Sequence, residues 1–117
     1  MDLDHQRCVP CEGGIGPLEL GQANEYLKQI PSWQIGKKGK QITKTFEFKN
    51  FKVAMVFVAK VAKIAEDENH HPDIHIENWN HVRIELYTHA IAGLHQNDFI
   101  VAAKIDRIEI GSRNGKI

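Results

Sequence analysis

The stretch from Phe51 to Asn69 contains neither glycine nor proline, and it predicts one long helix. Asn50 before it is a good N-cap residue, and Pro72 after it stops the helix because its ring disfavours helical geometry at the preceding residue. A broad apolar stripe is formed by Ala54, Phe57, Val58, Val61, Ile64 and Ala65. Further apolar residues lie off this stripe, at Met55, Val56, Ala59 and Ala62. We expect the helix to bury both sides, one on its own sheet and one on a partner subunit, unless it is a deep core helix.

Alternating apolar and polar residues on both sides of this helix predict two β-hairpins. Their turns are expected at residues 36–39, which are rich in glycine, and at Asn80-His81, since asparagine tolerates positive φ. Lys44 interrupts one alternation, which is typical of a bulge or of a strand near a sheet edge. The predicted strands cover residues 33–35, 42–48, 73–79 and 82–87.

Two shorter amphipathic helices, at residues 18–29 and 98–108, complete the order αββαββα. This order predicts an α+β fold, in which three helices cover one face of a four-stranded antiparallel sheet. The length of 117 residues suits one domain, which we place at residues 18–110. Residues 1–17 are expected to be a flexible N-terminal tail and residues 111–117 a C-terminal tail.

Composition excludes several classes of function. Fifteen basic residues balance fifteen acidic ones, whereas a nucleic-acid-binding domain would carry a basic excess. The sequence has neither an apolar run that could span a membrane nor a secretory signal, so we expect a cytoplasmic protein without a membrane partner. Cys8 and Cys11 have the spacing of half a zinc site, but no second such pair follows, and a thiol pair in the tail is the simpler interpretation.

The histidines give the first indication of a functional site, because six of the seven lie in the second half of the chain. With a turn at Asn80-His81, Pro72 and His89 are equally far from it, so antiparallel pairing brings His70 and His71 close to His89. The C-terminus of the long helix reaches the same place, and its partial negative charge favours imidazolium. That suits a general acid working near neutral pH.

Each of these residues also has an ordinary structural explanation. Asp98 follows His89 after a short loop, but an acid in the first turn of a helix is common. His70 and His71 are equally typical of a solvated helix end, and His89 of a hydrogen-bonded residue at a strand end. Only their predicted convergence favours a site.

Two further patterns, a possible metal site and a possible stacking residue, also have simpler explanations. His71 and His75 have a spacing that binds zinc on a helix, but Pro72 separates them, and along a strand that spacing spans about 13 Å. Trp79 is most simply a packing residue, although it would also offer an aromatic wall to a flat heterocycle.

One spaced pattern fixes residue types over about thirty positions: Glu66-x3-His70-His71-Pro72-x6-Trp79-x9-His89-x8-Asp98. Further stretches agree with it, namely Phe46-x-Phe48-Lys49-Asn50-Phe51, Thr88-His89, Gly93-Leu94 and Asp98-Phe99. In this combination, over about residues 17–108, the chain resembles the pterin-4α-carbinolamine dehydratase family (4a-hydroxytetrahydrobiopterin dehydratases). His95 departs from the pattern, since many members carry threonine or serine there, which puts the cap of the last helix in question.

The resemblance implies an α+β hydro-lyase that assembles as homodimers or homotetramers. Its reaction would remove water from 4a-hydroxytetrahydropterin to give quinonoid dihydropterin, which recycles the cofactor of aromatic amino-acid hydroxylases. By position, the expected catalytic residues are His70, His71 and His89, and the expected substrate contacts are Asp98, Trp79 and Glu66. Imidazoles can both donate and accept protons, so we expect no metal and no other cofactor.

The partners that follow are the pterin substrate and further copies of the chain, with phenylalanine hydroxylase as a candidate pathway neighbour. Two other functions remain alternatives: a non-catalytic oligomeric binding module, like the transcription cofactors among animal members, and a role in molybdopterin metabolism. A zinc protein that uses Cys8 and Cys11 is a weaker idea. The intact set of histidines favours the enzyme.

Overall fold

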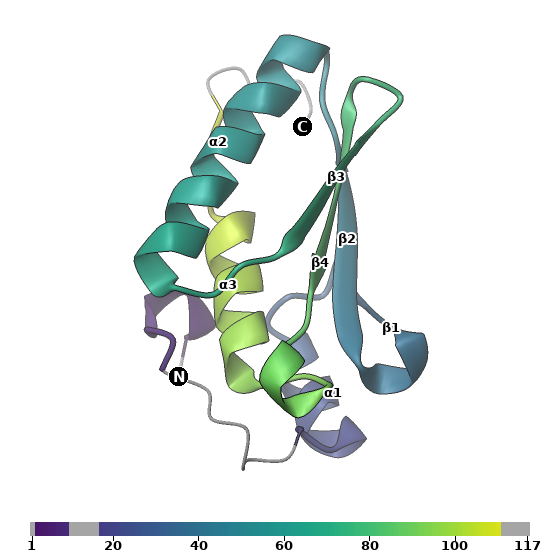
Figure 1. The fold of residues 1–117 in the computed structure, drawn as a ribbon, viewed down its shortest axis with the longest axis vertical. Helices are drawn as coiled ribbons and strands as arrows, with labels where there is room; N and C mark the ends of the chain where they lie inside the picture. Colours follow the sequence, from purple (N-terminus) through teal and green to yellow (C-terminus); the bar gives the residue numbers. More distant parts are fainter. Residues whose placement is uncertain (1, 10–16, 111–117) are drawn as a thin grey trace.

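The computed structural model describes residues 2–9 and 17–110. The strands form one antiparallel sheet in the order β1-β2-β4-β3, and α2 and α3 lie along one face of it, with α1 beside α3 at one end (Figure 1). The predicted α+β class and the order αββαββα are therefore confirmed. The elements are α1 (Leu20–Leu27), β1 (Gln34–Gly36), β2 (Gln41–Glu47), α2 (Phe51–Glu68), β3 (Asp73–Glu77), β4 (His81–Leu86) and α3 (Gln96–Asp106), with short 3-10 turns η1 (Leu3–His5), η2 (Lys37–Gly39) and η3 (His89–Ile91).

Local chemistry sets both ends of α2. The Asn50 side chain accepts a hydrogen bond of 2.8 Å from the backbone N–H of Val53, as the sequence predicted for an N-cap. At the other end, Asn69 takes the left-handed conformation with φ 54°, and the N–H groups of Asn69 and His70 both bond to the carbonyl of Ala65. The helix therefore ends before it reaches Pro72.

The core lies between the sheet and the two long helices. Alternate residues of β4, namely Val82, Ile84 and Leu86, are fully buried, and from α2 Ala54, Phe57 and Val61 pack toward them. Most of α3 is buried as well, because the sheet, the other helices and η1 surround it. Side chains at the start of α3 are consequently held inside the protein.

The turn of the β3–β4 hairpin lies two residues earlier than the sequence analysis expected. The last paired residues are Glu77 and His81, and the positive φ angles belong to Asn78 and Trp79. Asn80 is buried instead, and its amide nitrogen donates to the carbonyl of Phe48 at 2.7 Å. The expected turn at Asn80-His81 was placed too late: residues 78–80 form the turn, Asn80 is its last residue, and His81 already belongs to β4.

Lys44 lies on the core side of β2, where β1 no longer pairs with the strand. The last β1 partner, Gln34, pairs with Thr43, and the register to β4 continues without a bulge. The Lys44 ammonium donates to Asp106 on α3 at 2.8 Å, and the Trp33 indole donates to the same oxygen at 3.0 Å. Because β1 does not extend beside Lys44, a lysine fits among the core-facing residues of β2 at this position.

Part of the segment that was expected to be a tail contacts the domain. Leu3 is buried in the main core, and η1 packs against α3. Cys11 and the rest of residues 10–16, and the expected C-terminal tail 111–117, lie outside the described residues. Within the described part of the chain, no helix combines the length and the apolar character needed to cross a membrane.

Candidate active site

A buried histidine–carboxylate pair links the end of α2 to the start of α3. The Nε2 atom of His70 lies 2.7 Å from Oδ1 of Asp98, whose side chain is fully buried, whereas 11% of the His70 side chain is exposed. The other carboxylate oxygen accepts hydrogen bonds from the Thr88 hydroxyl at 2.8 Å and from the backbone N–H of His95 at 2.9 Å. Asp98 thus joins three elements of the fold at one point.

These contacts determine how His70 carries its proton. An ionised carboxylate can only accept hydrogen bonds, so Nε2 of His70 must be the donor. The Nδ1 atom is then the ring nitrogen left for a substrate, as an acceptor when the ring is neutral and as a donor when it is protonated. Asp98 is buried and its oxygens accept from protein groups, so it can orient His70, and its expected contact with a substrate stays a prediction.

The start of α3 fixes Asp98. His95 is the N-cap, and its Nδ1 atom accepts a hydrogen bond of 3.0 Å from the backbone N–H of Asn97. The Asp98 side chain in turn accepts a hydrogen bond from the backbone N–H of His95, and the two bonds together form a capping box. Histidine therefore serves as the cap at the position where the sequence departed from the resemblance.

A second histidine–carboxylate pair lies one residue further along the chain and faces solvent. The Nε2 atom of His71 lies 2.6 Å from Oε2 of Glu66, on the last turn of α2, and 53% of the His71 side chain is exposed. The carboxylate orients the imidazole while most of the ring stays accessible. His71 is therefore much more available to a bound molecule than His70.

His89 begins the short turn after β4, and it is exposed. Its ring packs against Tyr87, with 4.4 Å between the ring centroids. Partial burial, together with the nearby Asp73 carboxylate, raises the pKa of Tyr87 above its usual value, so this phenol stays protonated at neutral pH. An uncharged aromatic surface thus supports one side of His89.

The hairpin register brings some of the expected site residues together and separates one of them. Asp73 pairs with Glu85, and continuing this register places His70 level with Thr88, next to His89. Trp79 lies at the opposite end of β3, in the hairpin turn, with 61% of its surface exposed. Within one chain, the length of β3 therefore separates Trp79 from His70, His71 and His89.

Thr88, which the resemblance contained without a role, also belongs to this group of contacts. It is buried, and its hydroxyl bonds to Asp98. A signal was available, because Thr88 continues the inward-facing series of Val82, Ile84 and Leu86 at a spacing of two residues. A polar residue in such a series needs a buried partner.

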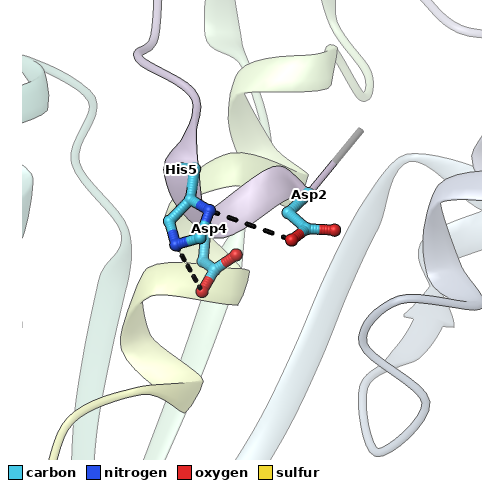
Figure 2. A group of neighbouring side chains, drawn as sticks. All are labelled: Asp2, Asp4 and His5. Carbon is cyan, nitrogen blue, oxygen red and sulfur yellow. Dashed lines mark ion pairs between the residues drawn. The ribbon is translucent and has the colours of Figure 1, made fainter.

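Within the described residues, one group of possible metal ligands has converging donor atoms. This group lies near the N-terminus, not among His70, His71 and His89. His5 stands between Asp2 and Asp4, with nitrogen–oxygen distances of 3.8 and 3.9 Å (Figure 2). Arg107 already donates to Asp4 at 2.6 Å, and most of His5 and Asp2 is exposed. Ion pairing explains this group without a metal.

Comparison with known proteins agrees with the geometry. Residues 16–108 match the family described as pterin 4 alpha carbinolamine dehydratase. A protein of Nitrosomonas eutropha is 46% identical over 93% of this chain and 95% of its own length. One of Halorhodospira halophila is 43% identical over 92% of this chain and 98% of its own length. Both carry the name pterin-4-alpha-carbinolamine dehydratase provisionally.

Solved structures give the same fold. A protein of Brucella melitensis, described as a transcriptional coactivator/pterin dehydratase, superposes with a TM-score of 0.72 at 33% identity, over 78% of this chain and 96% of its own. A pterin dehydratase-like protein identified as a RuBisCO assembly factor in the alpha-carboxysome superposes with a TM-score of 0.55 at 24% identity, over 64% and 86%. The second similarity concerns the fold alone.

Proposed function

Because the chain belongs to the pterin-4α-carbinolamine dehydratase family, we propose that it is a hydro-lyase that dehydrates 4a-hydroxytetrahydropterin to quinonoid dihydropterin. The observation that carries this proposal is the pair of adjacent histidines, each held by its own carboxylate, beside the turn that bears His89. Such imidazoles can exchange protons with a ligand near neutral pH without a metal.

The reaction needs one proton donor and one proton acceptor. The C4a–O bond breaks with its electron pair on oxygen, and a histidinium supplies the proton that turns this oxygen into water. A ring-nitrogen lone pair forms the new C=N bond, and that nitrogen passes its N–H proton to a neutral imidazole. Atoms and charge balance, since the substrate loses one water and the enzyme exchanges one proton in each direction.

The exposure of the three histidines supports a division of roles. His71 and His89 are accessible, and we assign them to the reacting carbon and its neighbouring nitrogen. His70 is mostly buried and contacts the ligand or assists proton transfer through Nδ1, while Asp98 and Glu66 orient His70 and His71. The expected contact of Trp79 with substrate stays a prediction, because within one chain it lies at the far end of the hairpin.

The direct test is a dehydration assay. 4a-Hydroxytetrahydropterin would be generated chemically, and its dehydration would be followed by absorbance with and without the protein. We expect the protein to raise the rate in proportion to its concentration. A rate equal to the uncatalysed one over the pH range 6 to 9 would reject the hydro-lyase.

An apolar stripe on the outer side of α2 supports assembly with further copies of the chain. Phe51, Met55, Ala59 and Ala62 recur at helical spacing and are exposed, Phe51 by 52% and Met55 by 39%. A second copy that presents the same stripe would bury it by symmetric helix packing. Met55, Ala59 and Ala62 belong to the second apolar side that we expect from the sequence to face a partner subunit; Val56, the fourth residue of that side, is 43% exposed as well.

Placing a charge in this stripe is expected to separate the subunits. In Ala59→Glu, the carboxylate would lie between Met55 and Ala62, where burial without a partner is unfavourable. Analytical ultracentrifugation should then give a single species of about 13.3 kDa, the mass of one chain. Lys60→Glu is the control. It changes an exposed charged residue next to Ala59 in the sequence, outside the stripe, and should leave the assembly intact. An unchanged oligomer in Ala59→Glu would place the interface elsewhere.

A non-catalytic binding module is the second candidate function, and two observations favour it. The Brucella melitensis relative is described as a coactivator as well as a dehydratase, and the α2 stripe is a ready contact surface. A stoichiometric complex with another protein, together with no turnover in the assay above, would favour this function over the enzyme.

A further inference from the structure

Residues 7–9, here called the strap, cross the junction between the end of α2 and the start of α3. The backbone N–H of Cys8 donates to the Glu68 carboxylate at 2.8 Å, and Arg7 lies 3.2 Å from the other oxygen of Glu68. Glu68 is the last residue of α2, and only 5% of its side chain is exposed. A buried carboxylate therefore anchors the strap on the α2 side, one turn from the histidine pair.

Asn97 anchors the strap on the α3 side. Its Oδ1 atom accepts from the Val9 N–H at 3.0 Å, and its amide nitrogen donates to the Val9 carbonyl at 2.6 Å. One side chain thus satisfies both backbone groups of Val9, as a neighbouring β-strand would. Asn97 is 2% exposed and directly precedes Asp98, so the strap lies against the helix turn that holds the buried carboxylate.

The Cys8 thiol lies against the first turn of α3. Its sulfur lies 3.7 Å from the Asn97 carbonyl. Burial is the main cause that raises the pKa of Cys8 to about 12, and the Glu68 carboxylate raises it further; Lys104 opposes this, and Asp98 adds a smaller increase. The thiol is therefore protonated at neutral pH, and it adds no charge next to the Asn97 carbonyl.

We propose that Asn97 is a positioning residue of the candidate active site. It holds the strap over the start of α3, and the strap keeps water away from Asp98. The Asp98 carboxylate, shielded from water, then fixes the orientation and tautomer of His70. A charge-assisted hydrogen bond is stronger where water is excluded, because the local dielectric constant is low. The strap lies outside the segment that matches the family, which begins at residue 16. This inference rests on the proposed function for its catalytic part only.

The experiment uses the full chain in a Cys11→Ser background, so that Cys8 is the remaining thiol. Asn97→Ala removes both bonds to Val9, and its matched control Gln96→Ala removes a neighbouring contact, the bond from Gln96 to Gln6. In Asn97→Ala we expect Cys8 to react with iodoacetamide at least about 10-fold faster, because the thiol of a detached strap ionises more readily. Gln96→Ala should stay within about twofold of the parent.

Two further measurements connect the strap to the site. In imidazole ¹H–¹⁵N spectra, the proton on Nε2 of His70 should exchange with water about 10-fold faster in Asn97→Ala. In the dehydration assay, kcat should fall roughly 10-fold with KM nearly unchanged, since the His70 ring is no longer held in its orientation. If Asn97→Ala fails to fold, Val9→Pro removes the same N–H donor, and Val9→Ala is its control, because the Val9 side chain is 56% exposed.

The outcomes separate this inference from the proposed function. If the parent has no dehydratase activity, the proposed function fails, and the labelling and exchange rates still decide the role of the strap. If Asn97→Ala labels at the parental rate, Asn97 does not hold the strap, and the inference is rejected. If labelling accelerates while the His70 proton and kcat stay at parental values, the strap has no positioning role, and the inference is equally rejected.

Discussion

Asp98→Asn is expected to lower kcat by roughly 10²–10⁴-fold while the protein stays folded, because asparagine reverses the tautomer of His70. The asparagine oxygen can still accept from Thr88 and from the N–H of His95, but its NH₂ group then faces Nε2 of His70. Two donors cannot share a hydrogen bond, so His70 moves its proton to Nδ1. The nitrogen that we assign to the substrate thereby changes from acceptor to donor.

Three measurements check this prediction. Imidazole ¹⁵N shifts should show the His70 proton on Nδ1, kcat should fall, and the free energy of unfolding should drop by only about 1 kcal/mol, since one contact is exchanged for a weaker one. Asp106→Asn is the matched control on the same helix. It weakens the bonds to Lys44 and Trp33, so it should lower the melting temperature and leave kcat within about twofold. An Asp98→Asn enzyme with parental kcat would contradict the assigned role of His70.

His71→Ala is expected to lower kcat by about 10²–10⁴-fold, the range for loss of a general acid or base, with little change in stability. The ring is 53% exposed, and its partner Glu66 is 76% exposed, so its removal leaves no cavity and no buried unpaired charge. The urea midpoint should therefore stay close to the parental value. Glu66→Gln, which keeps a hydrogen-bond acceptor but removes the charge, should lose less activity than His71→Ala.

His75→Ala is the control for this experiment. His75 is also partly exposed, and its Nε2 atom lies 3.2 Å from the Glu85 carboxylate, but it belongs to β3 and pairs with Arg83 rather than with the site residues. Its kcat should be unchanged. Equal losses in His71→Ala and His75→Ala would mean that the assay responds to a general change in the protein rather than to one imidazole.

The elements that the sequence predicted correctly are those with local causes. The long helix follows from a cap at Asn50 and a continuous apolar stripe, and the strands follow from alternation. The hairpin turn was misplaced because its position depends on a distant contact, the bond from Asn80 to the carbonyl of Phe48. No local signal distinguishes Asn78, which takes the positive φ, from Asn80, which is buried at the end of the same turn.

The candidate site could be predicted as a set of residues, but its pairings could not. The order of elements indicated that His70, His71 and His89 approach one another, and the roles assigned to them stay predictions. That Asp98 binds His70 while Glu66 binds His71 depends on rotamers and burial, which no spacing reveals. Docking of residues 2–9 was missed as well, because it depends on scattered polar contacts rather than on a periodic pattern.

The contacts between the first residues and α3 also constrain the order of folding. Arg107 bonds to Asp4 and Asn97 to Val9, across nearly the whole length of the chain. Residues 2–9 can therefore dock only after α3 has formed, and contacts of such high sequence separation form slowly. The start of α3, which carries Asp98, would then gain its contacts with residues 2–9 only late in folding, and a bulky group attached close to residue 2 is expected to disturb them.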